Sequence, residues 1–358
     1  MELLSVTMND GVKPRSEIEG KDNSSEDKSN YKIVRKGDMV YNSMRMWQGA
    51  NGISPCDGIV SPAYTVLMPK QEINNGYFAA LFKSANLINE FRKNSQGMTS
   101  DTWNLKYPQI ETIKVQIPSV SEQDKVSELF GVLDARIVAQ AQLIEALKKY
   151  KRGLLRKVFA KLSDSCEKRN LKEVSVLFAD GDWIESKDQA SDGIRLIQTG
   201  NVGFGVYIDK TQNAKYISET TFHRLNCLEI YDGDILISRL PEPAGRACLL
   251  PKSTERRITA VDCTVIRTDS SVIDRNYLLQ FLCSEQYLKT VNSFLAGGTR
   301  QRISRKNLEG IEVPYPSIDE QRYWGSFLCK VDARISNEEQ RLSSLSRLRC
   351  FMLQQLFI

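Results

Sequence analysis

The chain has 358 residues, of which 41% are hydrophobic and 26% charged, and this composition is ordinary for a globular protein of two or three domains. No window approaches the roughly eighteen consecutive apolar residues of a membrane span, and no secretory signal is visible, so we expect a cytoplasmic protein without membrane contact. Eight scattered cysteines without a CxxC pair argue against a zinc site, and a net charge of +5 permits a polyanionic partner without demanding one.

In chain order, the sequence predicts a globular segment over residues 1–117, a helix over 118–160, a second globular segment over 161–315 and a second helix over 316–358. Both globular segments mix strand-like and helix-like stretches, so we expect an α+β fold for each. A Gly-Asp pair followed by an apolar run, Gly37-Asp38 in the first and Gly233-Asp234 in the second, predicts a turn and then a strand.

The two helical segments are copies of one another at a constant offset of 198 residues. Over the 42 positions from Pro118 to Phe159, 12 are identical to the positions from Pro316 to Phe357. The sequence Pro-Ser-x-x-Glu-Gln opens both copies, and Asp-Ala-Arg-Ile recurs in both at 134–137 and 332–335. An internal duplication of this kind predicts two similar halves related by a pseudo-twofold axis.

Each helix is predicted to start at a capping box and to carry a heptad seam. Ser119 with Glu122, and Ser317 with Glu320, have the spacing of such a box. The two seams have polar residues at the same two positions, which favours an antiparallel coiled coil over two unrelated amphipathic helices that each pack on their own domain. Pairing of Lys151 with Glu338 across the seam is one possible register. The predicted seam residues are Phe130, Leu133, Ile137, Gln140, Ile144, Leu147, Lys151, Leu154, Leu328, Val331, Ile335, Glu338, Leu342, Leu345, Arg349 and Met352.

The globular segments align more weakly. Ser5-Val6 aligns with Ser175-Val176, and Met1 then aligns with Leu171. On this alignment about 26 extra residues lie in the second segment between Asp180 and Asp234, since 54 minus 28 positions is 26, and they cover residues 194–201. Two domains with a common frame and different surfaces suggest two related but non-identical targets.

Catalytic motifs are not evident in the sequence. It contains one histidine, His223, and neither a phosphate-binding Gly-x-x-x-x-Gly-Lys loop nor a defensible cluster of carboxylates. We therefore interpret the chain as a binding protein and not an enzyme, with no cofactor or metal of its own.

The doubled order of globular domain and Pro-x-x-x-Glu-Gln helix resembles the specificity subunit of type I restriction–modification systems. The resemblance is carried by residues 311–321 and 115–123, and by 233–239 and 298–304. It implies that each globular domain recognises one half of a bipartite, asymmetric double-stranded DNA site. It also implies that the helix pair sets the half-site spacing and docks two methyltransferase (modification) subunits. Those subunits would hold S-adenosylmethionine, and restriction/translocase subunits would join them. Family members usually have a segment ahead of the point aligned with Met1.

Residues for DNA contact are chosen by type, because arginine suits guanine, asparagine and glutamine suit adenine, and lysine or arginine suits phosphate. For any one residue a structural role in the core or a turn is the alternative. The candidates are Asn42, Arg45, Trp47, Gln48, Asn51, Gln96 and Thr99 in the first domain, and Arg195, Gln198, Asn201, Arg239, Arg246, Arg300, Gln301 and Arg302 in the second. A specificity module of another defence assembly, and a coiled-coil adaptor without a DNA role, remain open alternatives.

Overall fold

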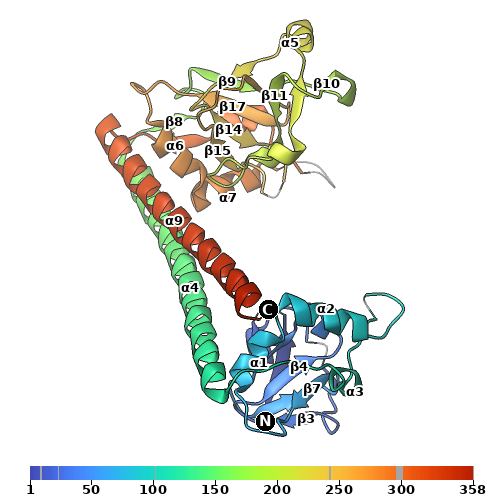
Figure 1. Cartoon of the computed structure of the whole chain (residues 1–358). Helices are drawn as coiled ribbons and strands as arrows, with labels where there is room; N and C mark the ends of the chain where they lie inside the picture. The colour runs from blue at the N-terminus through green and yellow to red at the C-terminus, as the bar shows by residue number, and fades with distance from the viewer. Residues whose placement is uncertain (9, 23, 101, 242, 296–300, 358) are drawn as a thin grey trace. The chain divides into compact units, whose positions relative to one another are not determined.

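The chain folds into two compact units that share two long helices. The structure is a computed structural model, and it describes residues 1–8, 10–22, 24–100, 102–241, 243–295 and 301–357. Unit 1 comprises Met1–Gln142 with Glu338–Ile358, and unit 2 comprises Leu143–Asn337. The helices α4 (Val120–Ser165) and α9 (Ile318–Leu356) each contribute one half to each unit (Figure 1). No helix in the described ranges is long and apolar enough to cross a membrane.

The globular part of unit 1 has two small sheets and short helices, which confirms the α+β expectation. Strands β1 (Glu2–Thr7), β2 (Gly11–Pro14), β3 (Lys32–Val34) and β6 (Gly58–Val60) form a sheet of order β2-β1-β6-β3. Strands β4 (Met39–Asn42), β5 (Asn51–Ile53) and β7 (Tyr64–Leu67) form a second sheet of order β5-β4-β7. The helices are η1 (Arg15–Glu17), η2 (Met46–Gln48), α1 (Asn75–Leu81), α2 (Ala85–Asn94) and α3 (Tyr107–Ile110).

Unit 2 repeats this plan with additions. One sheet has the order β10-β12-β11-β16-β13, a second has β15-β14-β17-β9, and β18 pairs with β8. The strands are β8 (Lys168–Asn170), β9 (Leu177–Asp180), β10 (Gln189–Ala190), β11 (Ile194–Ile197), β12 (Lys215–Ile217), β13 (Glu229–Ile230), β14 (Ile235–Ser238), β15 (Ala247–Leu249), β16 (Arg257–Thr259), β17 (Cys263–Arg267) and β18 (Glu312–Pro314). The helices are η3 (Ser186–Asp188), η4 (Thr199–Asn201), η5 (Thr211–Asn213), α5 (Glu219–Leu225), α6 (Arg275–Leu282), α7 (Glu285–Ser293) and α8 (Arg305–Glu309).

Strand register shows which parts of the two units correspond, and it corrects the sequence alignment. β1 runs parallel to β6 with Leu3 opposite Ile59, and β11 runs parallel to β16 with Leu196 opposite Ile258. β1 therefore corresponds to β11, and the alignment of Met1 with Leu171 is wrong. The additional length of unit 2 lies ahead of β11, in the segment that holds β8, β9 and β10. Placing that length in residues 194–201 was wrong as well, because these residues begin with the equivalent of β1.

The Gly-Asp turn is confirmed in both units. Gly37 and Gly233 have φ of +92° and +86°, a conformation that a side chain would strain. The carboxylate of Asp38 accepts a hydrogen bond from the N–H of Arg35 at 2.8 Å. The carboxylate of Asp234 accepts one from the N–H of Tyr231 at 2.9 Å. The same turn thus leads into β4 and β14.

Each long helix uses one bond of the expected capping box. The Ser119 N–H donates to the Glu122 carboxylate at 3.1 Å, whereas the Ser317 hydroxyl accepts from the Glu320 N–H at 3.3 Å. In both cases the donor is a backbone N–H at the start of the helix, which has no partner within the helix itself. The helices extend over Val120–Ser165 and Ile318–Leu356, where the sequence predicted 118–160 and 316–358.

Candidate nucleic-acid interface and helix pair

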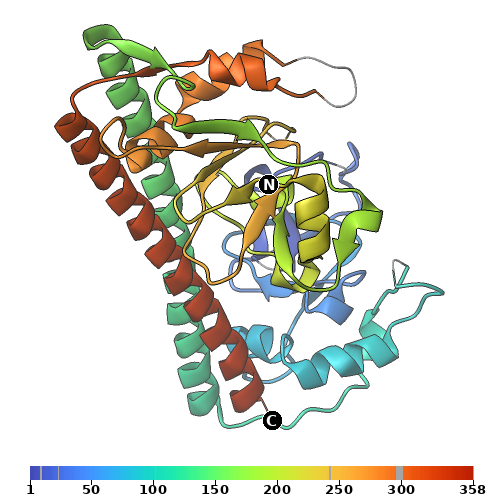
Figure 2. The same cartoon turned by 90° about the horizontal axis from the view of Figure 1, so that it is seen from above.

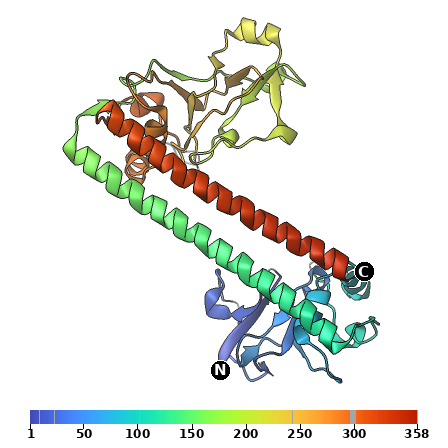
Figure 3. The same cartoon turned by 60° about the vertical axis from the view of Figure 1, so that its left-hand side comes forward.

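Within each unit, halves of α4 and α9 run side by side in opposite directions (Figures 2 and 3). In unit 1 the Arg349 guanidinium pairs with the Asp134 carboxylate, with one N···O distance of 3.1 Å. In unit 2 the Lys151 ammonium pairs with the Asp332 carboxylate. Because 134 + 198 = 332 and 151 + 198 = 349, these are the same ion pair in two copies. The duplication is therefore expressed as a repeated contact as well as a repeated sequence.

Gln140 of α4 and Glu338 of α9 make a further polar contact between the two helices, within unit 1. They are equivalents of each other, since 140 + 198 = 338, and both side chains are buried. The Gln140 amide donates to the Glu338 carboxylate at 2.7 Å and to its backbone carbonyl at 3.1 Å. Each of these two residues thus meets its own equivalent in the other long helix. The possible pairing of Lys151 with Glu338 is therefore wrong, because this register places Glu338 opposite Gln140.

The predicted seam residues of the two helices are all buried or partly buried. Those recorded as buried are Phe130, Leu133, Gln140, Ile144, Leu328, Ile335 and Glu338. Those that are partly buried are Ile137, Leu147, Lys151, Leu154, Val331, Leu342, Leu345, Arg349 and Met352. Phe130 also stacks on Phe357 with ring centroids 5.9 Å apart, so the seam in unit 1 continues into the domain core.

The glutamine of each Pro-x-x-x-Glu-Gln motif joins a long helix to its domain. The buried Gln123 amide donates to the Pro118 carbonyl at 3.0 Å, and its oxygen accepts from the Asn74 N–H at 2.9 Å. Gln321 makes the same two bonds, to Pro316 at 2.9 Å and from Asp274 at 3.0 Å. Asn74 and Asp274 in turn cap helices α1 and α6. The motif is therefore a structural joint that fixes each domain to its helix.

Beside this joint, a helix of the domain packs closely against the long helix at a glycine. The glycine belongs to the domain helix in unit 1 and to the long helix in unit 2. In unit 1, Gly76 of α1 faces Ser127 of α4, and a side chain at Gly76 would collide with the serine hydroxyl. In unit 2, Gly325 of α9 is the equivalent of Ser127 and faces the backbone of Asn276 in α6. Each domain is thus fitted to the helix that follows it in the chain.

A surface patch on unit 1 gathers around η2, and we call it the η2 patch: Arg45, Trp47, Gln48, Arg92, Gln96 and Trp103. Trp47 meets Trp103 edge to face with centroids 5.1 Å apart, and the Arg92 guanidinium lies over Trp47 at 5.9 Å. The Trp47 indole N–H donates to the Met44 carbonyl at 3.1 Å, which fixes the ring. Among the described residues, no hydrogen-bond or ion-pair partner is recorded for the Arg45 guanidinium. The patch combines a fixed aromatic platform with an available cation.

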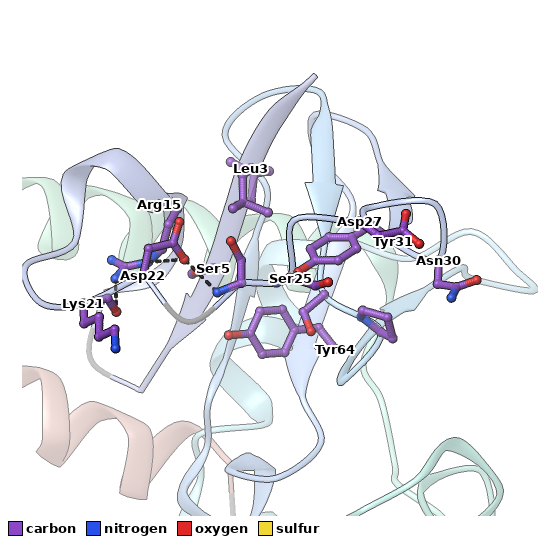
Figure 4. A pocket seen from close by; sticks show the side chains of 14 residues that line it. Leu3, Ser5, Arg15, Lys21, Asp22, Ser25, Asp27, Asn30, Tyr31 and Tyr64 are labelled. Atoms are coloured by element: carbon purple, nitrogen blue, oxygen red, sulfur yellow. Dashed lines mark hydrogen bonds and ion pairs between the residues drawn. The ribbon is translucent and has the colours of Figure 1, made fainter.

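The two units also have polar pockets at equivalent positions beside β1 and β11. The unit 1 pocket has a volume of about 530 Å³ and includes Leu3, Arg15, Tyr31 and Tyr64 (Figure 4). Arg15 donates to three carbonyls of the loop that borders it, Ile18, Gly20 and Lys21, at 2.7 to 3.0 Å. This arginine therefore holds the wall of the pocket in shape.

The unit 2 pocket has a different lining. It has a volume of about 180 Å³ beside Leu196, the equivalent of Leu3, and its wall includes Gln198, Lys210, Asn213 and Lys215. Lys210 and Lys215 are exposed and have no recorded ion-pair partner among the described residues. At equivalent positions of the fold, the pocket wall thus has tyrosines and a loop with Asp22 and Asp27 in unit 1. In unit 2 it has two lysines and amide side chains.

The titratable groups near these surfaces are not arranged for catalysis. Burial raises the pKa of Tyr207, and the neighbouring Arg195 guanidinium only partly opposes that effect. Burial also raises the pKa of the Cys227 thiol to about 11. Both groups stay protonated and neutral near pH 7, which is the unreactive form of a phenol or thiol. The described ranges contain no group of three or more His, Cys, Asp or Glu residues placed to hold a metal ion.

Comparison with known proteins identifies the family of this chain. The family model described as "Type I restriction modification DNA specificity domain" matches residues 5–149 and 163–347, one segment for each copy of the duplication. The chain belongs to this family. Its members are non-catalytic specificity subunits, in agreement with the interpretation as a binding protein, and the chain is a DNA specificity subunit of a type I restriction–modification system.

Two curated relatives come from Methanocaldococcus jannaschii. The type I restriction enzyme MjaVIII specificity subunit is 24% identical over 336 residues, which cover 88% of this chain and 77% of the relative. The putative type I restriction enzyme MjaX specificity subunit is 21% identical over 290 residues, which cover 76% of this chain and 64% of the relative. The chain therefore spans less than two thirds of the second relative's length.

Two solved structures share the fold. One, described as the structural basis of complex assembly and conformational transition of the type I R-M system, has a TM-score of 0.58 at 18% identity and covers 93% of this chain and 84% of its own. The S subunit of a type I restriction–modification system from M. genitalium has a TM-score of 0.56 at 19% identity, with 91% and 84% covered. These similarities confirm the fold of two domains and two packed helices.

Several residues that the sequence offered for DNA contact are instead used inside the domains. Asn51 is fully buried and donates to the Gly49 carbonyl at 3.1 Å, and Asn201 donates to the Ile208 carbonyl at 2.9 Å. Arg195 is buried and pairs with Asp209 at 2.8 Å. The side-chain nitrogens of Asn51, Asn201 and Arg195 are therefore engaged in contacts inside the domains. A polar residue after a strand looks the same in sequence whether it contacts a base or a turn.

Two more arginines hold loops together. Arg239 is buried, donates to the Val261 carbonyl at 2.6 Å and lies 3.4 Å from the Asp180 carboxylate. Arg246 donates to five backbone carbonyls, at distances from 2.7 to 3.1 Å, which belong to Thr199, Val202, Leu240, Pro241 and Pro243. Both guanidinium groups therefore make contacts within unit 2, Arg246 to backbone carbonyls and Arg239 to a carbonyl and a carboxylate.

The remaining candidates stay at or near the surface. Gln96, Thr99, Gln301 and Arg302 are exposed, and Asn42, Arg45, Trp47, Gln48 and Gln198 are partly buried. Arg302 lies 3.5 Å from the Asp262 carboxylate. Arg300 lies outside the described residues. Sequence reasoning missed Arg92 and Trp103, which join the η2 patch only through the tertiary fold, and Lys210 and Lys215, whose isolated positions carry no pattern.

Proposed function

We propose that each globular unit reads one half of a bipartite, asymmetric double-stranded DNA site, and that the helix pair sets the distance between the halves. One observation carries the proposal. The contacts between α4 and α9 repeat at a constant offset of 198, whereas the surfaces of the two globular parts differ in lining and charge. A symmetric frame with two different readers suits a target that has two different halves at a fixed spacing.

The η2 patch supplies the chemistry of sequence readout in unit 1. Arginine reads guanine through two acceptors, and glutamine reads adenine through an acceptor and a donor in the major groove. Arg45 is the N-cap residue of η2 and Gln48 is its last residue, and the Trp47 ring between them is held by its hydrogen bond to the Met44 carbonyl. In unit 2, Gln301 and Arg302 have the same residue types and are exposed. Lys210 and Lys215 suit phosphate contacts, which add affinity without sequence information.

The helix pair also suits the docking of two modification subunits, because a pseudo-twofold presents the same surface twice. Tyr150 on α4 and Leu348 on α9 are equivalents, since 150 + 198 = 348, and they are 55% and 47% exposed. Exposed apolar side chains at equivalent positions are typical of an interface that is used twice. S-adenosylmethionine and the methyl transfer to adenine belong to these modification subunits, and restriction/translocase subunits complete the assembly.

The test is the methylated sequence motif of cells that express this chain with its modification subunits. The double variant Arg45→Ala/Gln48→Ala should relax the sequence at one half of the motif and leave the other intact. The double variant Gln301→Ala/Arg302→Ala should relax the other half, and Lys252→Ala in an exposed loop should change neither. Active methylation with no bipartite motif, or relaxation of both halves by each variant, would contradict the proposal.

The spacing function has its own test. Inserting seven residues into both α4 and α9 beside Gln140 and Glu338 keeps the heptad seam in register. At a rise of about 1.5 Å per residue the pair lengthens by about 10 Å, the length of about three base pairs. We expect the same two half-sites with a spacer about three base pairs longer, and an unchanged spacer would show that the helix pair does not set it.

A further inference from the structure

Backbone hydrogen bonds in unit 2 tie the chain beside Arg302 to the sheet that contains β14 and β17. Arg239 directly follows β14 and Asp262 directly precedes β17, and these two strands pair side by side (Figure 1). The Arg239 N–H donates to the Asp262 carbonyl at 2.9 Å, and the Ile303 N–H donates to the Arg239 carbonyl at 3.3 Å. Asp262 and Arg302 are thus brought to the same end of the sheet.

The side chains of Asp262 and Arg302 form an ion pair that is open on one side. The Arg302 Nη1 atom lies 3.5 Å from the Asp262 Oδ1 atom, and the two side chains are 59% and 30% exposed. That Oδ1 atom is buried and makes no hydrogen bond to any residue that the structure describes. A guanidinium has five N–H donors, so a contact at one nitrogen leaves most of the donors of Arg302 available.

Unit 1 has the same backbone contacts without these side chains. The Ser43 N–H donates to the Ala63 carbonyl at 3.3 Å, and the Leu105 N–H donates to the Ser43 carbonyl at 2.8 Å. These bonds are the equivalents of the two in unit 2, because the paired strands β4 and β7 correspond to β14 and β17. The carboxylate of unit 2 is thus replaced by an alanine in unit 1, and the arginine by Asn104. The backbone frame is shared, and the ion pair belongs to unit 2.

We propose that Asp262 is a positioning residue that orients Arg302 to recognise a guanine in the half-site read by unit 2. The inference rests on the proposed function and names one base of that half-site. Arginine contacts guanine through the O6 and N7 acceptors, and this bidentate contact requires a defined orientation of the planar guanidinium. A carboxylate that holds one nitrogen restricts the rotamers of the side chain. Arg302 therefore loses less conformational freedom when it binds the base.

The geometry disfavours two other roles for this ion pair. An aspartate can itself accept a hydrogen bond from cytosine, but the Asp262 oxygen nearest Arg302 is buried, where a base does not reach it. A phosphate contact needs only positive charge, and a carboxylate 3.5 Å from the guanidinium lowers the positive potential there. A carboxylate beside the arginine thus suits the recognition of a base edge better than the binding of a phosphate.

The first experiment reads the methylated motif produced by the full chain with its modification subunits. Arg302→Ala and Asp262→Ala should each make one guanine of the unit 2 half-site degenerate and leave the rest of the motif unchanged. Arg302→Lys keeps the charge without the planar fork and should act like Arg302→Ala. Asp262→Asn preserves the size of the side chain and should relax the same guanine partly. Arg305→Ala is the matched control and should change nothing, because Arg305 forms a comparable ion pair with Glu309 at 3.3 Å, with side chains 49% and 28% exposed.

The second experiment measures binding of the assembled complex to duplex DNA that contains the motif. Replacing the guanine by 7-deazaguanine removes the N7 acceptor, and it should weaken binding of the unchanged complex at least about fivefold. The same replacement should have no effect on the Arg302→Ala complex. Asp262→Ala added to Arg302→Ala should cause no further loss of discrimination, because Asp262 acts through Arg302.

Three results would overturn the inference and leave the proposed function in place. The first is a bipartite motif in which Arg302→Ala relaxes no guanine. The second is equal weakening of binding to all sequences by Arg302→Ala, which is the mark of a phosphate contact. The third is an unchanged motif in both Asp262 variants. A methylated motif that is not bipartite would instead overturn the proposed function, and the inference with it.

Discussion

The helix pair and the globular domains have diverged to different degrees since the duplication. The contacts described above between α4 and α9 relate to their equivalents by 198 positions. In the domains the offset changes from 193 for Leu3 and Leu196, to 196 for Met39 and Ile235, and to 200 for Tyr77 and Tyr277. Insertions were thus accepted between the strands but not along the helices. A coiled coil loses its seam when its register shifts, whereas loops between strands tolerate changes in length.

A second difference separates the two domain cores, because that of unit 2 is closed by the segment 167–180. Ile311→Ala should lower the free energy of unfolding of unit 2 by about 3 kcal/mol, since a buried isoleucine is replaced by a cavity. The same change at its equivalent, Ile113→Ala, should cost about 1 kcal/mol because that side chain is already partly exposed. Hydrogen exchange of strands β17 and β7 reports each unit separately. Equal costs would show that Ile113 and Ile311 are equally well packed in solution.

The joint between domain and helix should behave alike in both units. Gln123→Ala and Gln321→Ala each leave an N–H and a carbonyl without a partner at a site that is at least partly buried. We expect a cost of about 2 kcal/mol in each case. The measurement is denaturant unfolding with exchange readout at α1 and α6. A cost confined to one unit would mean that the other half of the duplication no longer relies on this motif.

The two equivalent ion pairs should differ in their contribution to the free energy of unfolding, because Asp332 has an additional partner. The buried Gln280 amide donates to Asp332 at 2.7 Å, whereas the equivalent of Gln280 in unit 1 is Ala80. Asp332→Ala should therefore cost about 1.5 kcal/mol, from the ion pair and a stranded amide. Asp134→Ala should cost about 0.5 kcal/mol, from a partly exposed ion pair alone. Adding Gln280→Ala to Asp332→Ala should remove most of the difference in cost between Asp332→Ala and Asp134→Ala. If the costs of Gln280→Ala and Asp332→Ala are instead fully additive, the Gln280 amide is not the origin of that difference.

The sequence was most informative where structure depends on local periodicity. The seam, the caps and the repeated contacts between α4 and α9 follow from heptads and a constant offset, all of which are visible in one chain. The equivalence of β1 and β11 was beyond reach, because it depends on a parallel pairing between strands about 55 residues apart. The roles of Arg195 and Arg239 were equally hidden, since their partners are carboxylates and carbonyls that only the fold brings near. Gln123 belongs to a motif that is visible in the sequence, but its bond to Asn74 spans 49 residues and only the fold reveals it.

The smallest effect concerns thiols, which can report on the stability of unit 2 alone. Burial raises the pKa of Cys248 to about 12, of Cys263 to about 11 and of Cys283 to about 12, and all three lie in unit 2. Cys350, near the end of α9, is exposed. Iodoacetamide at pH 7.5 should therefore modify Cys350 first, because the other three are both shielded and protonated.

Raising the pH from 7 to 9 should leave Cys248, Cys263 and Cys283 unreactive, since pH 9 is still below their raised pKa values. Mass spectrometry of the alkylated peptides measures each site. Ile311→Ala should then expose the three unit 2 thiols at a lower denaturant concentration than Ile113→Ala does. Reaction of Cys248, Cys263 and Cys283 at the same denaturant concentration in both variants would mean that the two cores unfold as one, and that their difference in packing has no consequence for stability.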